Sequence, residues 1–152
     1  MKYNNVMITD FRMPIFKTAF QLYFAELGVI IRQWDELFEE MTKEGGNVAY
    51  LCLNDDNTVI GFIQFKVISF SSYFFETKMG FIREFWVANE YRNLGHGTEL
   101  LHYAEEYFIN QGIYKSILTT DSAENFYLKR GYIKDIDIWA KNKDVVFIKS
   151  LR

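Results

Sequence analysis

The chain has few of the residues that mark disulfide-stabilised, zinc-binding or disordered proteins. Its 152 residues include one cysteine, Cys52, one proline and two histidines. A single cysteine excludes an internal disulfide framework and a thiolate zinc cluster, and only two histidines, His96 and His102, argue against a His-rich metal site. One proline among 49% hydrophobic residues excludes a collagen-like or low-complexity chain. We therefore expect one folded domain over residues 1–152, without a metal, in a reducing compartment.

Long apolar runs and an excess of basic residues are also lacking. No uninterrupted hydrophobic stretch approaches the roughly 20 residues that cross a bilayer, and no apolar segment follows the first five residues as in a signal peptide. The formal net charge of −3 provides no positive field to hold phosphate backbones. These absences predict a cytoplasmic protein that binds neither membranes nor nucleic acid.

Aromatic residues, by contrast, are abundant at 18%, and the charges are divided unevenly. Residues 1–76 carry 6 Lys/Arg against 10 Asp/Glu, whereas residues 77–152 carry 11 against 10. Most aromatic side chains must lie in the core. Their number is also compatible with an aromatic ligand pocket or a homodimer interface. The uneven charge indicates that the two halves meet different ligands.

Hydrophobic periodicity alternates between the helical and the strand type along the chain. Apolar residues at helical spacing, each set followed by a glycine, predict helices over 11–27, 30–44 and 98–111. Asp121 and Glu124 have the spacing of a capping box, which predicts a short helix over 122–130. β-branched and aromatic runs predict strands over 6–9, 47–53, 58–70, 81–87, 113–120, 132–138 and 145–149, with a turn at 54–57. The pattern predicts an α/β domain with a mixed sheet.

The segment from Phe85 to Thr98 carries the clearest functional signal. A buried strand ends at Val87 and passes through a glycine-containing turn directly into a helix. The first turn of a helix has unpaired N–H groups and a partial positive charge, and glycines let an anion approach that backbone. The junction therefore predicts an anion site. From the two glycines alone, the alternative is a structural turn in which Gly95 and Gly97 supply positive φ. The segment is neither a G-x-G-x-x-G fingerprint nor a P-loop.

Two blocks of sequence resemble one known family. Arg92-x-x-Gly95-x-Gly97 is similar to the acyl-CoA loop [RQ]-x-x-G-x-[GA] of the GNAT superfamily of N-acyltransferases, and Ala123 to Tyr132 resembles its later A-x-x-[LF]-Y-x-x-x-G-[FY] segment. Together the blocks cover about residues 81–132. The resemblance implies an acyl-CoA N-acyltransferase fold with a mostly antiparallel central sheet flanked by helices. It also implies an acceptor-shaping part over about 1–80 and an acyl-CoA-binding part over about 81–152.

The resemblance further implies where acyl-CoA binds. The strand over 81–87 is expected to bulge and splay from its neighbour, so that the pantetheine arm lies in the gap. An amide there would also stabilise the oxyanion that forms on the thioester. His96 is expected to face solvent and to contribute only its backbone N–H. The expected contacts are Trp86, Val87, Arg92, Asn93, Leu94, Gly95, His96, Gly97, Thr98 and Asn125.

Two residues are candidates for the chemistry. Tyr127, with an ordinary pKa of about 10, stays protonated at neutral pH, and the resemblance places it on the helix that points a tyrosine at the CoA sulfur, as a general acid. The alternative is a tyrosine that fills the core beside Phe126. Glu84 is the only carboxylate in strand 81–87, so it is the candidate base or amine-orienting acid. The alternatives are that it pairs with Arg83 or faces solvent, and that a water chain deprotonates the amine.

The implied activity is N-acetyl transfer from acetyl-CoA to a primary amine of a small molecule or peptide, by direct attack in a ternary complex and without a metal. One alternative is a CoA-binding or regulatory module without turnover, and another is a structural domain whose aromatic residues form an interface. The acidic N-terminal half favours a cationic acceptor. Trp34, Tyr73, Phe74 and Phe75 would instead admit an aromatic one.

Overall fold

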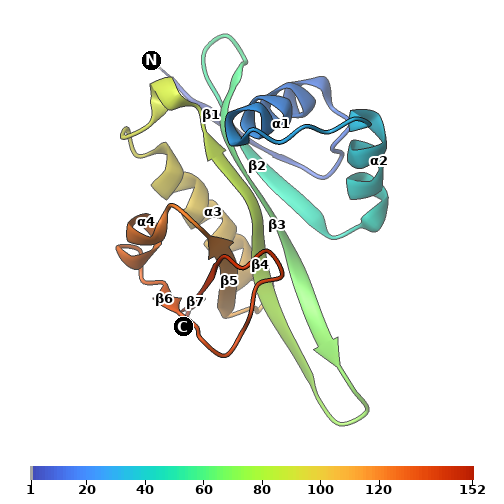
Figure 1. The fold of residues 1–152 in the computed structure, drawn as a ribbon, viewed down its shortest axis with the longest axis vertical. Helices are drawn as coiled ribbons and strands as arrows, with labels where there is room; N and C mark the ends of the chain where they lie inside the picture. Colours follow the sequence, from blue (N-terminus) through green and yellow to red (C-terminus); the bar gives the residue numbers. More distant parts are fainter. Residues whose placement is uncertain (1) are drawn as a thin grey trace.

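A seven-stranded sheet runs through the molecule in the order β1-β2-β3-β4-β5-β7-β6 (Figure 1). The computed structural model describes residues 2–152. Neighbouring strands are antiparallel except β4 and β5, which are parallel. This confirms the mostly antiparallel, mixed sheet. The strands are β1 (Asn4–Ile8), β2 (Asn47–Leu53), β3 (Val59–Ser71), β4 (Glu76–Val87), β5 (Lys115–Thr120), β6 (Ile133–Lys134) and β7 (Val145–Ser150).

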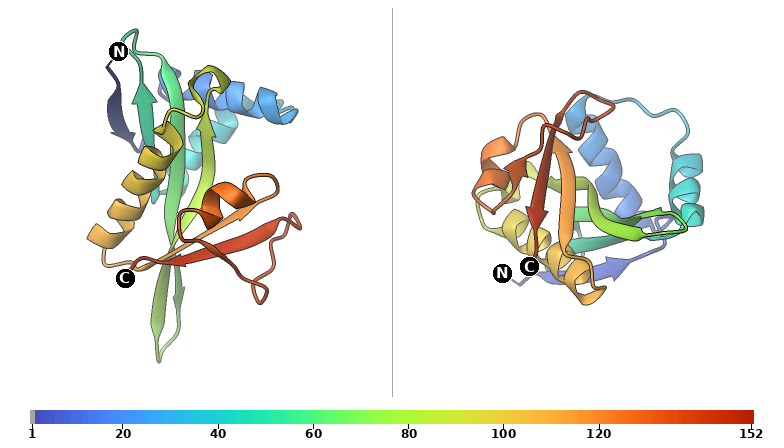
Figure 2. Two further views of the ribbon diagram at one scale, coloured as in Figure 1. Left: turned by 90° about the vertical axis from the view of Figure 1, so that its left-hand side faces the viewer. Right: turned by 90° about the horizontal axis from the view of Figure 1, so that it is seen from below.

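Helices cover both faces of this sheet (Figures 1 and 2). They are α1 (Pro14–Leu27), α2 (Trp34–Glu44), α3 (His96–Asn110) and α4 (Glu124–Leu128), with a 3₁₀ turn, η1 (Asn89–Tyr91), after β4. The first two pack on one face, and α3 and α4 pack on the other. Within residues 2–152, every helix is too short or too polar to cross a membrane.

Two aromatic-rich cores hold the helices to the sheet. Phe16 lies at the centre of the α1–α2 core, with its ring centroid 5.3 Å from those of Phe20 and Phe62. On the other face, Gly80 of β4 lies directly under Phe108 of α3. A Cβ atom at position 80 would come within 2.4 Å of the Phe108 ring, so α3 approaches β4 this closely only because residue 80 is glycine. These cores account for most of the aromatic content.

The ends of the elements show which local signals the structure follows. Helix α1 ends at Gly28, which is left-handed with φ of 73°, as expected. The prediction of a capping box at Asp121 and Glu124 is wrong, because α4 begins after Ala123 and has no side-chain cap. Thr120, at the end of β5, instead accepts a hydrogen bond from the Ala123 amide at 3.0 Å. The hydroxyl that ends the strand thus replaces the Asp121 carboxylate in organising the turn.

Strand β6 is shorter than the predicted 132–138. The Asp135 carboxylate accepts hydrogen bonds from the amides of Asp137 and Ile138, at 2.8 and 3.2 Å. Such an Asx turn gives these amides a local partner in place of a neighbouring strand. The ladder with β7 therefore stops at Lys134.

The β3–β4 hairpin is longer than the sequence indicates. Its ladder extends to the pair Ser71 and Glu76, beyond the predicted strand ends at residues 70 and 81. We call residues 67–79 the arm, because this part of the hairpin projects away from the body of the molecule (Figures 1 and 2). The aromatic residues at its tip are exposed: Tyr73, Phe74 and Phe75.

Candidate active site

The parallel strands β4 and β5 stay paired over only two positions. Gly80 pairs with Ser116 and Phe81 with Ile117, and within the described residues β4 has no strand partner on this side from Ile82 onward. Strand β4 nevertheless remains paired with β3 up to Val87. The two strands therefore diverge toward their carboxyl ends, which is the splay that the resemblance implies.

A β-bulge at Arg83 decides which way Glu84 points. Gln64 of β3 pairs with Glu84 and Phe65 with Ile82, so Arg83 is the extra residue. Strict alternation from Ile82, which lies in the α3-side core, would send Glu84 to that side as well. The bulge instead turns Glu84 toward Tyr23 of α1.

Arg83 does not form the ion pair with Glu84 that was one alternative for that carboxylate. The Arg83 guanidinium donates to Asn47 Oδ1 at 2.8 Å and to Glu44 Oε2 at 3.2 Å, at the end of α2. Glu84 remains beside the Tyr23 hydroxyl, largely removed from solvent. The alternative of a solvent-facing Glu84 is therefore wrong too.

Three ionisable side chains whose pKa is raised by burial come from three elements: Tyr23 of α1, Glu84 of β4 and Tyr127 of α4. Burial raises the pKa of Glu84, and interaction with the Tyr23 hydroxyl partly offsets this. Burial also raises the pKa of Tyr23, and the charges of Glu84, Tyr127 and Asp121 raise it further. Burial raises the pKa of Tyr127 to about 12. Burial therefore favours the neutral form of all three side chains.

The N-terminus of α3 lies in the loop that follows β4. Its N-cap is Gly95, left-handed with φ of 89°, and within residues 2–152 no side chain caps the first turn. A Cβ atom at Gly95 would meet nothing within 4 Å among the described residues, whereas one at Gly97 would contact the Phe126 ring at 3.5 Å. Arg92, Asn93, Leu94 and Thr98 are exposed. Open backbone N–H groups and free space above them are the features that an anion site requires.

The family model of the acetyltransferase (GNAT) family matches residues 8–132. The chain belongs to the GNAT family. This establishes the acyltransferase class and agrees with the fold. No curated protein sequence resembles the chain closely enough to count as a match.

Solved GNAT structures share the whole fold with this chain. A GNAT-family acetyltransferase from Staphylococcus aureus is 19% identical with a TM-score of 0.75, covering 99% of this chain and 100% of its own. A putative acetyl transferase from Pyrococcus furiosus is 23% identical with a TM-score of 0.70, over 92% and 99% of the two chains. NAA60 from Arabidopsis thaliana, solved with acetyl-CoA, is 13% identical with a TM-score of 0.75, over 99% of both chains. At these identities the likeness shows the fold alone.

Glu26 of α1 connects the loop that follows β4 to helix α1, and no sequence motif indicates this role. Its carboxylate accepts a hydrogen bond from Trp86 Nε1 at 2.8 Å and forms an ion pair with Arg92. The hydrogen bond from Trp86 has the largest effect on the pKa of Glu26, and Arg92 adds to it. Together they hold that pKa below its usual range. Arg92 also donates from Nε to the Val87 carbonyl at 2.8 Å. The Arg92 side chain therefore fixes the loop against β4 and α1.

Helix α4 carries Tyr127, and Arg130 follows two residues after the end of this helix. Tyr127 is buried, with its ring 5.2 Å from that of Phe126 and 5.7 Å from that of Tyr132. Arg130 stacks on the Phe126 ring at 3.8 Å and donates to Thr98 Oγ1 at 2.6 Å, which brings positive charge to the N-terminus of α3. Asn125 is exposed at the start of α4. Local sequence does not predict the contact of Arg130 with Thr98, because the two residues are 32 positions apart.

His96 does not face solvent, contrary to the sequence-based expectation. Its side chain is 8% exposed and packs edge-on against Tyr3, with ring centroids 4.4 Å apart. Its Nδ1 lies 3.9 Å from Cys52 Sγ. The helix starts at His96 itself rather than at residue 98, so the imidazole turns inward at the first position of α3 while the backbone remains at the helix end.

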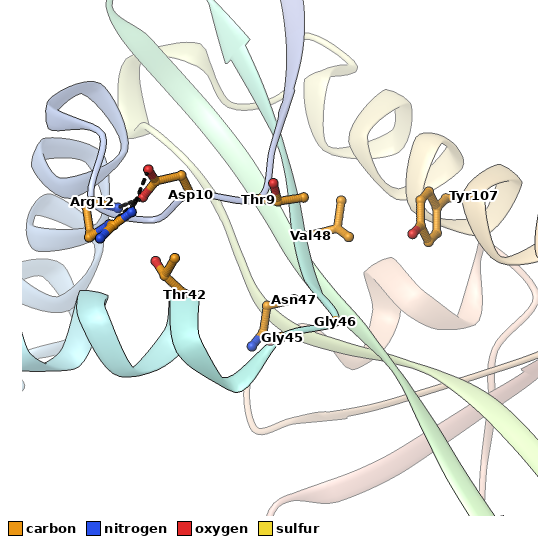
Figure 3. Close-up of a pocket in the computed structure, with 9 residues that line it drawn as sticks. All are labelled: Thr9, Asp10, Arg12, Thr42, Gly45, Gly46, Asn47, Val48 and Tyr107. Atoms are coloured by element: carbon orange, nitrogen blue, oxygen red, sulfur yellow. Dashed lines mark hydrogen bonds and ion pairs between the residues drawn. The ribbon is translucent and has the colours of Figure 1, made fainter.

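A separate surface pocket of about 480 Å³ lies where β1 ends and leaves the edge of β2 open (Figure 3). It includes Asp10 and Arg12, which pair with each other at 2.9 Å. None of the site residues expected from the sequence lines it. Within residues 2–152, no three His, Cys, Asp or Glu side chains are grouped as metal ligands.

Proposed function

We propose that the protein transfers the acetyl group of acetyl-CoA to a primary amine by direct attack in a ternary complex. The observation that carries this proposal is the divergence of β4 from β5 after Phe81, together with the uncapped N-terminus of α3 and the open space at Gly95. Glu84 of β4 and Tyr127 of α4 are the base and acid candidates for the gap in which a GNAT donor is expected. The Arabidopsis relative crystallised with acetyl-CoA and, separately, with a bisubstrate analogue supports the donor.

In this proposal the donor's pyrophosphate binds at the start of α3. The uncapped amides of residues 95–98 would donate to it, and Arg130 would add charge at the same helix end. Arg92 has a different role, because its guanidinium already contacts Val87 and Glu26. It holds the loop shape, and Trp86 and Val87 offer backbone groups to the pantetheine arm.

The chemical step needs a proton acceptor and a proton donor. The amine nitrogen bonds to the thioester carbonyl carbon, the C–S bond breaks, and the amine loses a proton. Glu84, whose pKa is raised by burial, is a stronger base than an exposed glutamate and would take that proton. Tyr127, with a pKa of about 12, stays protonated and would stabilise the leaving thiolate mainly by donating a hydrogen bond.

The positions of the exposed aromatic residues favour a cationic acceptor over an aromatic one. Tyr73, Phe74 and Phe75 lie at the tip of the arm, apart from the site, so they do not shape an aromatic pocket beside Glu84. Trp34 packs in the α1–α2 core. A cationic primary amine, attracted by the carboxylate of Glu84, therefore remains the favoured acceptor class.

Two measurements test this function. Calorimetric titration with CoA and acetyl-CoA should show binding, and release of free thiol should rise when primary amines are added. Binding without thiol release over a broad amine panel would favour the inactive CoA-binding module. Absence of binding would favour a structural domain.

Replacement of Tyr127 by phenylalanine should lower kcat by roughly 10²-fold, because the leaving thiolate loses its hydrogen-bond donor. The affinity for CoA should stay close to that of the wild type, since the buried ring is kept. Steady-state kinetics with calorimetry measure both values. If kcat is unchanged across the pH range, Tyr127 has no part in the chemical step and only fills the core beside Phe126.

Replacement of Tyr23 by phenylalanine should shift the acidic limb of the kcat/KM profile to higher pH. The Tyr23 hydroxyl lowers the pKa of Glu84, so its removal raises that pKa further. A pH–rate profile measures the shift, and Tyr103→Phe on the far face of the sheet is the matched control. Identical profiles for Tyr23→Phe and wild type would show that Tyr23 does not act on the base.

A further inference from the structure

The arm is a two-stranded ribbon with two open edges. The pairing of β2 with β3 ends at Asn47 and Lys66, and the pairing of β4 with β5 begins at Gly80. Beyond these positions, and within the described residues, β3 and β4 pair only with each other. A two-stranded ribbon is marginally stable in water, and an open edge offers unpaired N–H and C=O groups to another strand.

The arm also has an exposed apolar face. Directly opposite residues share a face, so Ser69 and Lys78 lie on one side, while Ile68 and Phe70 lie on the other. The ring of Phe75 stacks on that of Phe70 at 5.7 Å. At the tip, Tyr73 and Phe74 are almost fully exposed. A protruding cluster of this kind marks an interaction surface.

The sequence of the β4 edge is complementary to itself. It is Phe75-Glu76-Thr77-Lys78-Met79, with an acid and a base at equal distances from Thr77. In an antiparallel pair centred on Thr77, Glu76 of each copy lies opposite Lys78 of the other, and Phe75 lies opposite Met79. Opposite charges and apolar pairs in such positions stabilise a sheet, whereas like charges destabilise it.

We propose that the protein dimerises by antiparallel pairing of the β4 edges of two arms about a two-fold axis at Thr77. The interface is isologous, since each copy offers the same five residues. The present Glu76–Lys78 contact, at 3.6 Å between two half-exposed side chains, is weak enough to be exchanged for the two intermolecular pairs.

A notch at the base of the arm accommodates the partner's tip. It has a volume of about 510 Å³ and is lined by Glu76, Thr77, Lys78, Gly112, Tyr114, Lys115, Ser150 and Arg152. In the proposed register the intermolecular ladder ends at Phe75 opposite Met79, because β5 already pairs with Gly80. Tyr73 and Phe74 of the second copy therefore leave the ladder beside the start of β5, at the notch where Arg152 already stacks on Tyr114 at 4.1 Å. Three aromatic side chains from each copy, at roughly 150–250 Å² each, provide area on the scale of a stable interface.

Charge reversal tests the register directly. Sedimentation velocity over a concentration series should give a monomer–dimer equilibrium for the wild-type chain. Glu76→Lys places lysines opposite each other at both symmetry-related pairs, and Lys78→Glu places glutamates there. Each single variant should raise the dimer Kd about tenfold or more.

Two combinations should restore the dimer. The double variant E76K/K78E is again self-complementary, and an equimolar mixture of the two single variants should form a heterodimer. Glu39→Lys, on an exposed α2 pair, is the matched control and should leave the Kd unchanged. Because all three side chains are exposed, circular dichroism should show folded protein throughout.

The outcomes are distinct. A wild-type chain that stays monomeric at every concentration overturns the proposal. A dimer whose Kd is unchanged in both single charge-reversal variants also overturns it. A dimer weakened by either reversal but not restored in the mixture overturns the antiparallel register. Thiol release by the variants is measured in parallel, so failure of the dimer is distinguished from failure of the proposed function.

Discussion

Replacement of Glu84 by glutamine should lower kcat by about 10²- to 10⁴-fold, the range for loss of a general base. It should also remove the acidic limb of the pH–rate profile. In the wild type this limb falls where Glu84 becomes protonated, and burial moves that point above the usual range of a glutamate. The KM for acetyl-CoA should change little. The measurement is kcat/KM across pH for both proteins, with Glu106→Gln on the exposed side of α3 as the control.

The free energy of unfolding separates this effect from misfolding. The folded state binds the Glu84 proton more tightly than the unfolded state, so its ionisation costs stability as the pH rises from the unfolded to the folded pKa. Glutamine removes that cost, and the variant should be at least as stable as the wild type in urea at neutral pH. A stable variant that keeps both its rate and its acidic limb would show that a water chain or another group is the base.

Replacement of Gly95 by tryptophan should weaken CoA binding by about 10²-fold or more, the cost of losing at least two charge-assisted hydrogen bonds to phosphate. The space around Gly95 is open, so the indole has room to occupy the position above the α3 amides. Calorimetry with CoA measures the loss.

The control for backbone strain lies at the other end of the same helix. Gly112 also has positive φ, 75° against 89° at Gly95, and open space around its Cβ position. Gly112→Trp should therefore carry a similar conformational cost and bind CoA normally. Equal affinity in the two variants would place the pyrophosphate elsewhere than at the N-terminus of α3.

Local patterns predict most elements of this fold. Glycines after helical runs mark the ends of α1 and α2, and the turn at 54–57 joins β2 to β3 as expected. Local signals fail where a distant partner or a short turn overrides them. Glu105 of α3 is buried because Lys149 and Tyr132, both C-terminal to α3, contact its carboxylate at 3.1 and 2.9 Å.

The candidate site is predictable only in part for the same reason. The glycine loop and Tyr127 stand in contiguous motifs, whereas Glu26 and Tyr23 act across more than 50 residues of sequence. The side of β4 on which Glu84 lies depends on one extra residue, Arg83, and strand periodicity contains no sign of it. The GNAT resemblance implies a bulge in this strand, but its position at Arg83 and the long-range pairs are set by packing and are known only from the structure.

The contact of Glu26 with Trp86 and Arg92 limits how this scaffold can be re-engineered. One way to engineer the chain is to exchange α1 with the corresponding helix of another GNAT protein. A donor helix without an acid at this position would leave the indole N–H and the guanidinium without their partner, and would loosen the loop that follows β4. A successful chimera must therefore carry that carboxylate along with the new helix.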